Sequence, residues 1–228
     1  MKKTNFLPIS IGLNLVLFCF LLFFSINTKT ASQPEVPPSQ EGIIDEKGNA
    51  LKKVNIVMLG NSITYQGDWD KVLDRNDVFN GGKPGWTTQQ LSWVIKNFIV
   101  PYRPKLCFFK GGINDLTLGI SSQRIYENMT MVMDSISKVG TKPIYTTTLY
   151  QRTNTERNRT IDSINAKMKL FCEKRNYDFL DLRPFLCQSG DIKKEYVIDD
   201  NTHLKPQAYP QWALAMAPIL TKYGLNDN

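Results

Sequence analysis

Residues 54–64 read VNIVMLGNSIT, a largely apolar run that ends in a glycine, an asparagine and a serine. Valine and isoleucine are frequent in strands, and a short run of this kind is typical of a strand in a buried parallel sheet. The run therefore predicts a strand over residues 54–59 that ends at Gly60. Ser62 follows almost directly, at the edge of the sheet where open α/β folds bind their ligands.

Downstream of this strand, apolar runs alternate with segments of helical periodicity. Helical spacing of apolar residues marks segments 91–99, 125–136 and 161–171, and a last helix is expected over about residues 207–222. Helices between strands imply βαβ crossovers. The sequence therefore predicts an α/β fold, a three-layer α/β/α sandwich with a mainly parallel sheet of about five strands. The further strand candidates are residues 77–79, 106–109, 143–149 and 177–182.

The N-terminal part has the pattern of an exported protein that stays tethered to a membrane. Two lysines precede an apolar run over residues 6–26, about long enough to cross a bilayer core of ~30 Å. Residues 1–30 are expected to be an uncleaved membrane anchor, or a signal peptide if they are removed. The Pro- and Ser-containing stretch 31–42 is expected to be a linker. Residues 43–228 would then form one domain on the periplasmic or extracellular face.

Charge and cysteine content exclude several classes of function. The formal net charge is +7, of which three lysines in the first 29 residues supply part, and no basic stripe is interleaved with aromatic residues. Nucleic-acid binding is therefore not expected. Four cysteines and one histidine show no metal-ligand spacing, so neither a metal nor another cofactor is expected. Cys172 and Cys187 are candidates for a disulfide in an oxidising compartment.

Glycine-rich and polar segments follow the second and third predicted strands. Residues 80–88 read NGGKPGWTT, and such glycines either let backbone N–H groups approach a ligand or form an ordinary turn. Residues 111–115 read GGIND, which places the Asn114 amide behind flexible backbone, as a ligand donor or as a turn residue. Ser62 has a similar alternative, because serine is a common helix N-cap.

The chain contains one histidine, His203, which stands three residues after Asp200. Histidine is the side chain that changes charge near neutral pH. A carboxylate at this spacing can accept the Nδ1 proton and leave Nε2 as a base, the arrangement that activates a serine. His203 is therefore the candidate base, and Asp200 its orienting acid.

Taken together, these segments resemble the SGNH (GDSL-type) hydrolase family, over nearly the whole domain from about Val54 to Leu220. Sialate and other carbohydrate O-acetylesterases and platelet-activating-factor acetylhydrolase-like enzymes have similar G-N-S-I-T and G-I-N-D blocks. The resemblance implies a flavodoxin-like SGNH hydrolase fold. The matching blocks are LGNSIT at 59–64, NGGKPGWTT at 80–88, GINDL at 112–116 and DNTHL at 200–204.

The resemblance also implies residue roles. Ser62 would be the nucleophile, His203 the general base and then the general acid, and Asp200 the residue that orients His203. The oxyanion hole would combine the backbone N–H groups of Ser62 and Gly85 with the side-chain amide of Asn114. Gly82 is an alternative to Gly85.

Two positions depart from the family pattern. Asn61 stands where the family usually has aspartate, which removes a charge and is expected to alter specificity rather than abolish activity. Trp86 stands where aspartate is frequent, and its ring would either stack on a sugar or lipid-like group or pack against the protein.

The sequence thus predicts a serine esterase that acts on carboxylic ester bonds and removes acyl groups, most simply acetyl, from a small-molecule or glycan ester outside the cytoplasm. The alternatives are a lysophospholipase or thioesterase, a non-catalytic binding domain on the same scaffold, and acyl transfer to a glycan instead of water.

Overall fold

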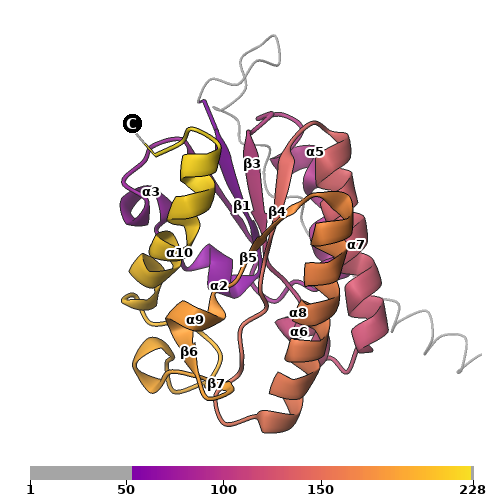
Figure 1. Ribbon diagram of the computed structural model, residues 1–228, viewed down its shortest axis with the longest axis vertical. Coiled ribbons are helices and arrows are strands. Elements are labelled where there is room, and N and C mark those ends of the chain that lie inside the picture. The colour runs from indigo at the N-terminus through magenta and orange to yellow at the C-terminus, as the bar shows by residue number, and fades with distance from the viewer. Residues whose placement is uncertain (1–52, 227–228) are drawn as a thin grey trace, which may run out of the picture. The chain divides into compact units, whose positions relative to one another are not determined.

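The computed structural model describes residues 53–226, and within this range five parallel strands form one sheet (Figure 1). The sheet order is β2-β1-β3-β4-β5, so the chain leaves β1 toward one edge and returns to its other side at β3. This confirms the predicted α/β fold. The strands are β1 (Ile56–Gly60), β2 (Val78–Gly82), β3 (Leu106–Phe109), β4 (Lys142–Thr146) and β5 (Asp178–Leu180).

Helices cover both faces of this sheet and make the outer layers of the sandwich (Figure 1). One face carries α3 (Trp69–Val72), α9 (Arg183–Leu186) and α10 (Ala208–Lys222). The opposite face carries α4 (Thr88–Trp93), α5 (Ile95–Phe98), α7 (Ser122–Lys138) and most of α8 (Thr155–Arg175). The remaining short elements are α2 (Ser62–Tyr65), α6 (Ile113–Thr117), β6 (Cys187–Gln188), β7 (Asp191–Ile192) and the 3-10 turn η1 (Lys194–Tyr196).

Strand β1 shows why the opening run of the sequence decides the architecture. Ile56 and Met58 pack into the cluster under α10, whereas Val57 and Leu59 pack into the cluster under α7. All four side chains are buried, because successive residues of a strand point to opposite faces. A strand that is apolar on both sides requires helices on both sides.

Element boundaries differ from the prediction at β2 and in the segment 91–99. Strand β2 continues to Gly82, three residues beyond the predicted end, because Asn80 and the two glycines pair in register with the end of β1. The helical segment 91–99 is divided at Val94, where ψ is −1°, into α4 and α5. The apolar spacing nevertheless identified buried positions on both helices.

Strand β4 ends at Thr146, although β-branched residues continue to Thr148. The Thr148 N–H donates to Asn165 Oδ1 at 3.0 Å, and the Thr148 carbonyl accepts from Asn165 Nδ2 at 2.9 Å. A side chain of α8 thus takes the backbone groups that a neighbouring strand would otherwise bind. The chain can then turn away from the sheet and form a loop over its carboxyl edge.

The disulfide that the sequence left open between Cys172 and Cys187 is not formed. Cys172 and Cys187 are both free thiols. Cys172 lies in the cluster under α7, and Cys187 packs against the cluster on the opposite face of the sheet. The sheet itself therefore separates the two sulfur atoms.

The predicted anchor (1–30) and linker (31–42) lie outside the described residues. From residue 53 to residue 226, no helix is both long enough and apolar enough to cross a membrane.

Candidate active site

The turn from β1 into α2 places Ser62 at the carboxyl edge of the sheet. Asn61 is the N-cap of α2, and its Oδ1 accepts the Ile63 N–H at 3.1 Å. Ser62 is the first helical residue, a position whose N–H has no partner within the helix. Gly60 permits this turn, because a Cβ there would lie 2.1 Å from Thr64 Oγ1. Ser62 therefore presents both its hydroxyl and its N–H at the edge.

Asn61 fills the position of the family's usual aspartate as a buried cap. Its side chain is inaccessible to solvent, and its Nδ2 has no hydrogen-bond partner among the residues described. The amide oxygen keeps the capping function that a carboxylate would have, without placing a negative charge beside Ser62.

The loop before α10 brings His203 to Ser62. His203 Nε2 lies 2.8 Å from Ser62 Oγ, and His203 Nδ1 lies 2.5 Å from Asp200 Oδ2. The other carboxylate oxygen of Asp200 accepts the backbone N–H groups of Thr202 and His203, each at 2.9 Å. The structure thus joins the three residues of the predicted triad in one hydrogen-bonded series, although Ser62 and His203 are 141 positions apart.

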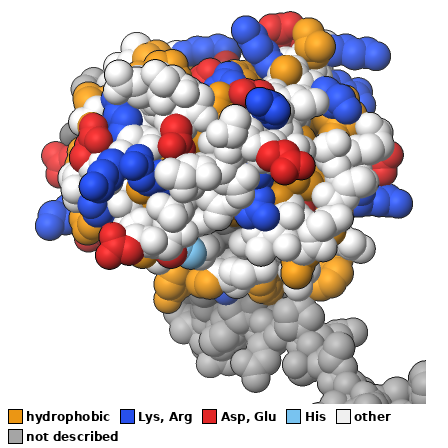
Figure 2. All heavy atoms as spheres, turned by 90° about the horizontal axis from the view of Figure 1, so that it is seen from below, with side chains coloured by type: hydrophobic (Ala, Val, Ile, Leu, Met, Phe, Trp, Pro, Cys, Tyr) orange, Lys and Arg blue, Asp and Glu red, His pale blue; other side chains and the backbone are white. Residues whose placement is uncertain are grey.

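The charge of Asp200 is stabilised by its surroundings. Burial alone would raise the pKa of this carboxyl, but hydrogen bonds from the backbone and ring of His203 and from the Thr202 N–H outweigh burial and lower the pKa. An ionised Asp200 that accepts the Nδ1 proton leaves the Nε2 lone pair free to accept the Ser62 hydroxyl proton. The His203 side chain is 29% exposed, and the histidine reaches the surface in the view from below (Figure 2).

The Asn114 side chain binds the backbone of the loop that contains Gly85. Asn114 lies in the first turn of α6, not in a loop, and its Nδ2 donates to the Trp86 carbonyl at 2.8 Å. This bond uses one of the two Nδ2 protons and leaves the other. Gly85 is exposed with φ of +78°, a backbone conformation that favours glycine. One hydrogen bond therefore connects Asn114 to the residue directly after Gly85.

The residue after Asn114 fixes its helix to the core. The buried carboxylate of Asp115 accepts the Thr88 hydroxyl at 2.6 Å and the Thr88 N–H at 3.0 and 3.1 Å. Asn128 Nδ2 donates to the same hydroxyl at 3.1 Å. Burial raises the pKa of Asp115, and the hydrogen bonds from Thr88 oppose that rise. Asp115 thus joins α6 to the start of α4 and limits the movement of the neighbouring amide.

Gly82 and Trp86 are the other two positions for which the sequence suggested a role in the site. The Gly82 N–H donates to Asn80 Oδ1 at 3.0 Å inside β2, so this N–H is already occupied. Trp86 is half-buried and packs against the cluster under α7, the packing alternative of the two that the sequence left open.

The loop between β4 and α8 supports the histidine loop. Gln151 Nε2 donates to Thr202 Oγ1 at 2.9 Å, and the Arg152 N–H donates to the Asn201 carbonyl at 2.9 Å. The backbone of Gln151 is held in turn by Asn158, whose Oδ1 accepts the Gln151 N–H and whose Nδ2 donates to its carbonyl, both at 2.9 Å. The sequence carries no local sign of this role of Gln151, because the contact joins residues 51 positions apart.

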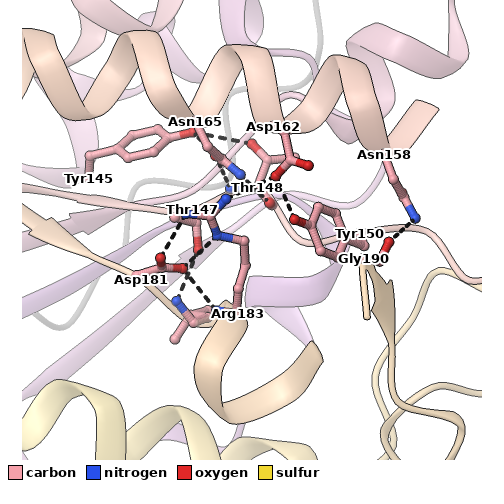
Figure 3. Close-up of polar contacts among 11 residues, drawn as sticks. Tyr145, Thr147, Thr148, Tyr150, Asn158, Asp162, Asn165, Asp181, Arg183 and Gly190 are labelled. Carbon is pink, nitrogen blue, oxygen red and sulfur yellow. Dashed lines mark hydrogen bonds and ion pairs between the residues drawn. The ribbon is translucent and has the colours of Figure 1, made fainter. Parts of the chain in front are cut away.

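A charged network holds the other side of this loop (Figure 3). Arg183 donates to Asp181 through Nε at 2.9 Å and Nη2 at 2.8 Å, and through Nη1 to Asp162 at 2.9 Å. Tyr150, next to Gln151, donates its hydroxyl to the same Asp162 oxygen at 2.5 Å. The hydrogen bonds from Arg183 outweigh the effect of burial and lower the pKa of Asp181. The loop is therefore tied to α8 and to the start of α9.

Lys110 is a second residue that sequence analysis did not identify. It follows β3 directly, is 1% exposed, and its Nζ has no hydrogen-bond partner among the residues described. Phe109 pairs with Tyr145 in the sheet, so Lys110 stands opposite Thr146, the next residue of β4. The Thr146 hydroxyl is also buried, and it has no hydrogen-bond partner among the residues described. Burial lowers the pKa of Lys110 from its ordinary 10.5 to about 8.

We expect Lys110→Met to raise the free energy of unfolding by about 3 kcal/mol at pH 7, because methionine fills similar space without a buried charge. The folded protein binds the lysine proton more weakly than the unfolded chain, so wild-type stability rises with pH between about 8 and 10.5. The gain in free energy of unfolding of the variant over the wild type is therefore largest below pH 8, and it vanishes near pH 10.5. Urea titrations across this range measure it, with exposed Lys105→Met as the control. A pH-independent difference, or a less stable variant, would contradict the assignment.

A three-layer α/β/α sandwich with a serine, a histidine and an aspartate bonded in series beyond its parallel strands has the architecture of a serine hydrolase. The GDSL-like Lipase/Acylhydrolase family matches the chain over residues 58–210, and the chain belongs to that family. The described domain is therefore an ester-hydrolysing domain of this family.

Similar proteins agree with this placement. A GDSL-like lipase from Bacteroides thetaiotaomicron superposes with a TM-score of 0.65 at 18% identity, over 74% of this chain and 88% of that one. A variant of an acetyl-xylooligosaccharide esterase from Geobacillus superposes with a TM-score of 0.62 at 17% identity, over 76% and 95%. At these identities the two structures show the shared fold alone.

An N-acylneuraminate cytidylyltransferase from Streptococcus agalactiae is 23% identical to this chain over 158 residues. The matched region is 69% of this chain and 36% of that relative. The chain spans less than half the length of the curated relatives it matches.

Proposed function

We propose that the protein is a serine esterase that removes acetyl groups from a carbohydrate ester outside the cytoplasm through an acyl-serine intermediate. The observation that carries the proposal is the unbroken series from Ser62 Oγ through His203 to Asp200, with distances of 2.8 and 2.5 Å. In the proposal, the Asn114 amide and the backbone N–H groups of Ser62 and Gly85 bind the oxyanion.

Acylation would begin with attack of Ser62 Oγ on the ester carbonyl while His203 Nε2 accepts the hydroxyl proton. The carbonyl oxygen becomes an oxyanion and binds the N–H groups of Ser62 and Gly85 and the second Nδ2 proton of Asn114. When the tetrahedral intermediate collapses, His203 gives its proton to the departing alcohol oxygen. Asp200 holds the ring in the required tautomer throughout, and it stabilises the positive charge that the ring carries between the two proton transfers.

Deacylation would repeat these steps with water. His203 accepts a proton from the incoming water, the oxyanion forms again on the same donors, and Ser62 leaves with the proton from His203. Any alcohol that enters in place of water would accept the acyl group instead. We propose hydrolysis as the outcome, and the 29% exposure of the His203 side chain, which gives water access to it, supports this.

The composition of the site rim supports a carbohydrate substrate. Four polar side chains lie on or between the histidine loop and α6: Gln151, Thr202, Thr117 and Arg157. Hydroxyl, amide and guanidinium groups suit sugar hydroxyls better than an alkyl chain. An acetyl-xylooligosaccharide esterase shares this fold, so the fold is compatible with a carbohydrate ester substrate.

The proposed location rests on the sequence alone. Two lysines followed by the apolar run 6–26 favour a cytoplasmic N-terminus and an exported domain. We propose that this segment tethers the enzyme to the membrane and that the linker 31–42 holds the domain away from it.

A substrate panel on the full chain tests the proposal. We expect acetylated sugars and aryl acetates to be turned over, with kcat/KM falling about 10-fold or more for each lengthening of the acyl chain beyond a few carbons. Faster turnover of lysophospholipids or long-chain thioesters would show the lipid acylhydrolase instead. Failure of a fluorophosphonate to label Ser62 would indicate a non-catalytic binding domain.

A further inference from the structure

Arg157 occupies a fixed position in the first turn of α8. Its backbone N–H donates to the N-cap side chain of Asn154 at 3.2 Å. Its guanidinium donates through Nη1 to Gln151 Oε1 at 2.7 Å and lies 3.4 Å from Thr117 Oγ1. The side chain is half-buried, and these contacts limit its rotamers before any ligand arrives.

Both contacts of Arg157 lead to the active site. Gln151 binds Thr202, the residue directly before His203. Thr117 lies one turn after Asn114 on α6, and its hydroxyl donates to the Ile113 carbonyl at 3.0 Å. The guanidinium therefore stands between the loop that carries the imidazole and the helix that carries the proposed oxyanion amide.

Arg157 has no acidic partner within residues 53–226. Two aspartates in the neighbouring loops bind other groups: Asp191 accepts the Thr153 N–H at 3.1 and 3.2 Å, and Asp200 is bound to His203. Nε and Nη2 of Arg157 donate to no described residue. A positioned guanidinium with one free edge is the geometry that binds a carboxylate through two hydrogen bonds.

We propose that Arg157 binds a carboxylate on the alcohol part of the substrate, so that the enzyme acts on acetylated acidic sugars. The inference rests on the proposed function, because the esterase mechanism determines on which side of the site the alcohol part of the substrate lies. His203 must protonate the departing alcohol oxygen, so the alcohol lies on the side of the histidine loop. Through Gln151, Arg157 stands on that side.

The test compares three substrates that carry acetyl at the same sugar hydroxyl: a methyl glucoside, the corresponding methyl glucuronoside, and the glucoside 6-phosphate. The full-length wild type should hydrolyse the glucuronoside with a kcat/KM about 10- to 100-fold above that of the neutral sugar, the range of a charge-assisted hydrogen bond. The preference should lie mainly in KM and fall with added salt.

Variants assign the preference to one residue. Arg157→Met should reduce the ratio of acidic to neutral kcat/KM to near one, and Arg157→Lys should keep part of it, because lysine retains the charge but not the planar fork. The matched control is Arg159→Met, which removes an exposed arginine of the same helix. The ratio is insensitive to a general loss of active enzyme.

Each unfavourable outcome separates the inference from the proposed function. Equal turnover of all three sugars, or an acidic preference that survives in Arg157→Met, would overturn the carboxylate site while leaving the esterase in place. A preference for the 6-phosphate over the glucuronoside would replace a carboxylate by a phosphate ligand. Turnover of aryl or lipid esters with none of any acetylated sugar would overturn the proposed function itself.

Discussion

Replacement of Ser62 by alanine, and separately of His203 by alanine, should each reduce kcat/KM for an aryl acetate by on the order of 10⁴-fold or more, the loss typical of residues that act as one catalytic unit. Oγ has no substitute as the nucleophile. Without Nε2, which lies 2.8 Å from it, the hydroxyl keeps its proton. The double variant should be no slower than the single ones, because the second change removes a group that no longer acts.

Stability measurements distinguish lost chemistry from lost fold. Ser62 and His203 lie at the sheet edge, where neither side chain belongs to the buried core, so both variants should unfold at nearly the wild-type temperature. Ser92→Ala is the matched control, because this hydroxyl binds only the Gln89 carbonyl of its own helix. Wild-type rates in either single variant would show that another residue performs the reaction.

The sequence predicts those parts of the site whose positions depend on residues close by in the chain. Asp200 and His203 are three residues apart, so their contact needs only one turn of chain. Ser62 follows a strand that is apolar on both faces, and this pattern alone places it at a sheet edge. Asn114 follows another such strand. Because the carboxyl ends of parallel strands share one edge, the meeting of these groups follows from the fold class.

The parts that the sequence does not predict depend on tertiary contacts. Lys110 is a charged residue in a glycine-rich segment, and only the packed sheet and its helices make it buried. The end of β4 depends on Asn165, whose side chain binds the Thr148 backbone from 17 positions away. Gln151 has no local pattern that would distinguish it from an ordinary loop residue. Sequence periodicity indicates which face of an element is apolar. It does not indicate which distant side chain will bind the backbone groups that a neighbouring strand would otherwise bind.

Asn114→Ala should lower kcat by about 10²- to 10³-fold with a much smaller change in KM, because an oxyanion donor is used in the transition state and hardly at all in the ground state. The structure favours the upper part of that range. Asn114 Nδ2 also holds the Trp86 carbonyl at 2.8 Å, so its loss would free the neighbouring Gly85 N–H from its position as well. Single-turnover measurements with an aryl acetate would separate kcat from binding.

Asn114→Asp is the sharper variant, because it preserves shape while changing a donor into a charged acceptor. A carboxylate at this position would repel both the Trp86 carbonyl and the oxyanion, so the loss in kcat should equal or exceed that of Asn114→Ala. Leu118→Ala, at the exposed end of the same helix, controls for disturbance of α6. If Asn114→Asp instead kept wild-type kcat, the amide would not bind the oxyanion. The two backbone N–H groups of Ser62 and Gly85 would then have to stabilise it without a third donor.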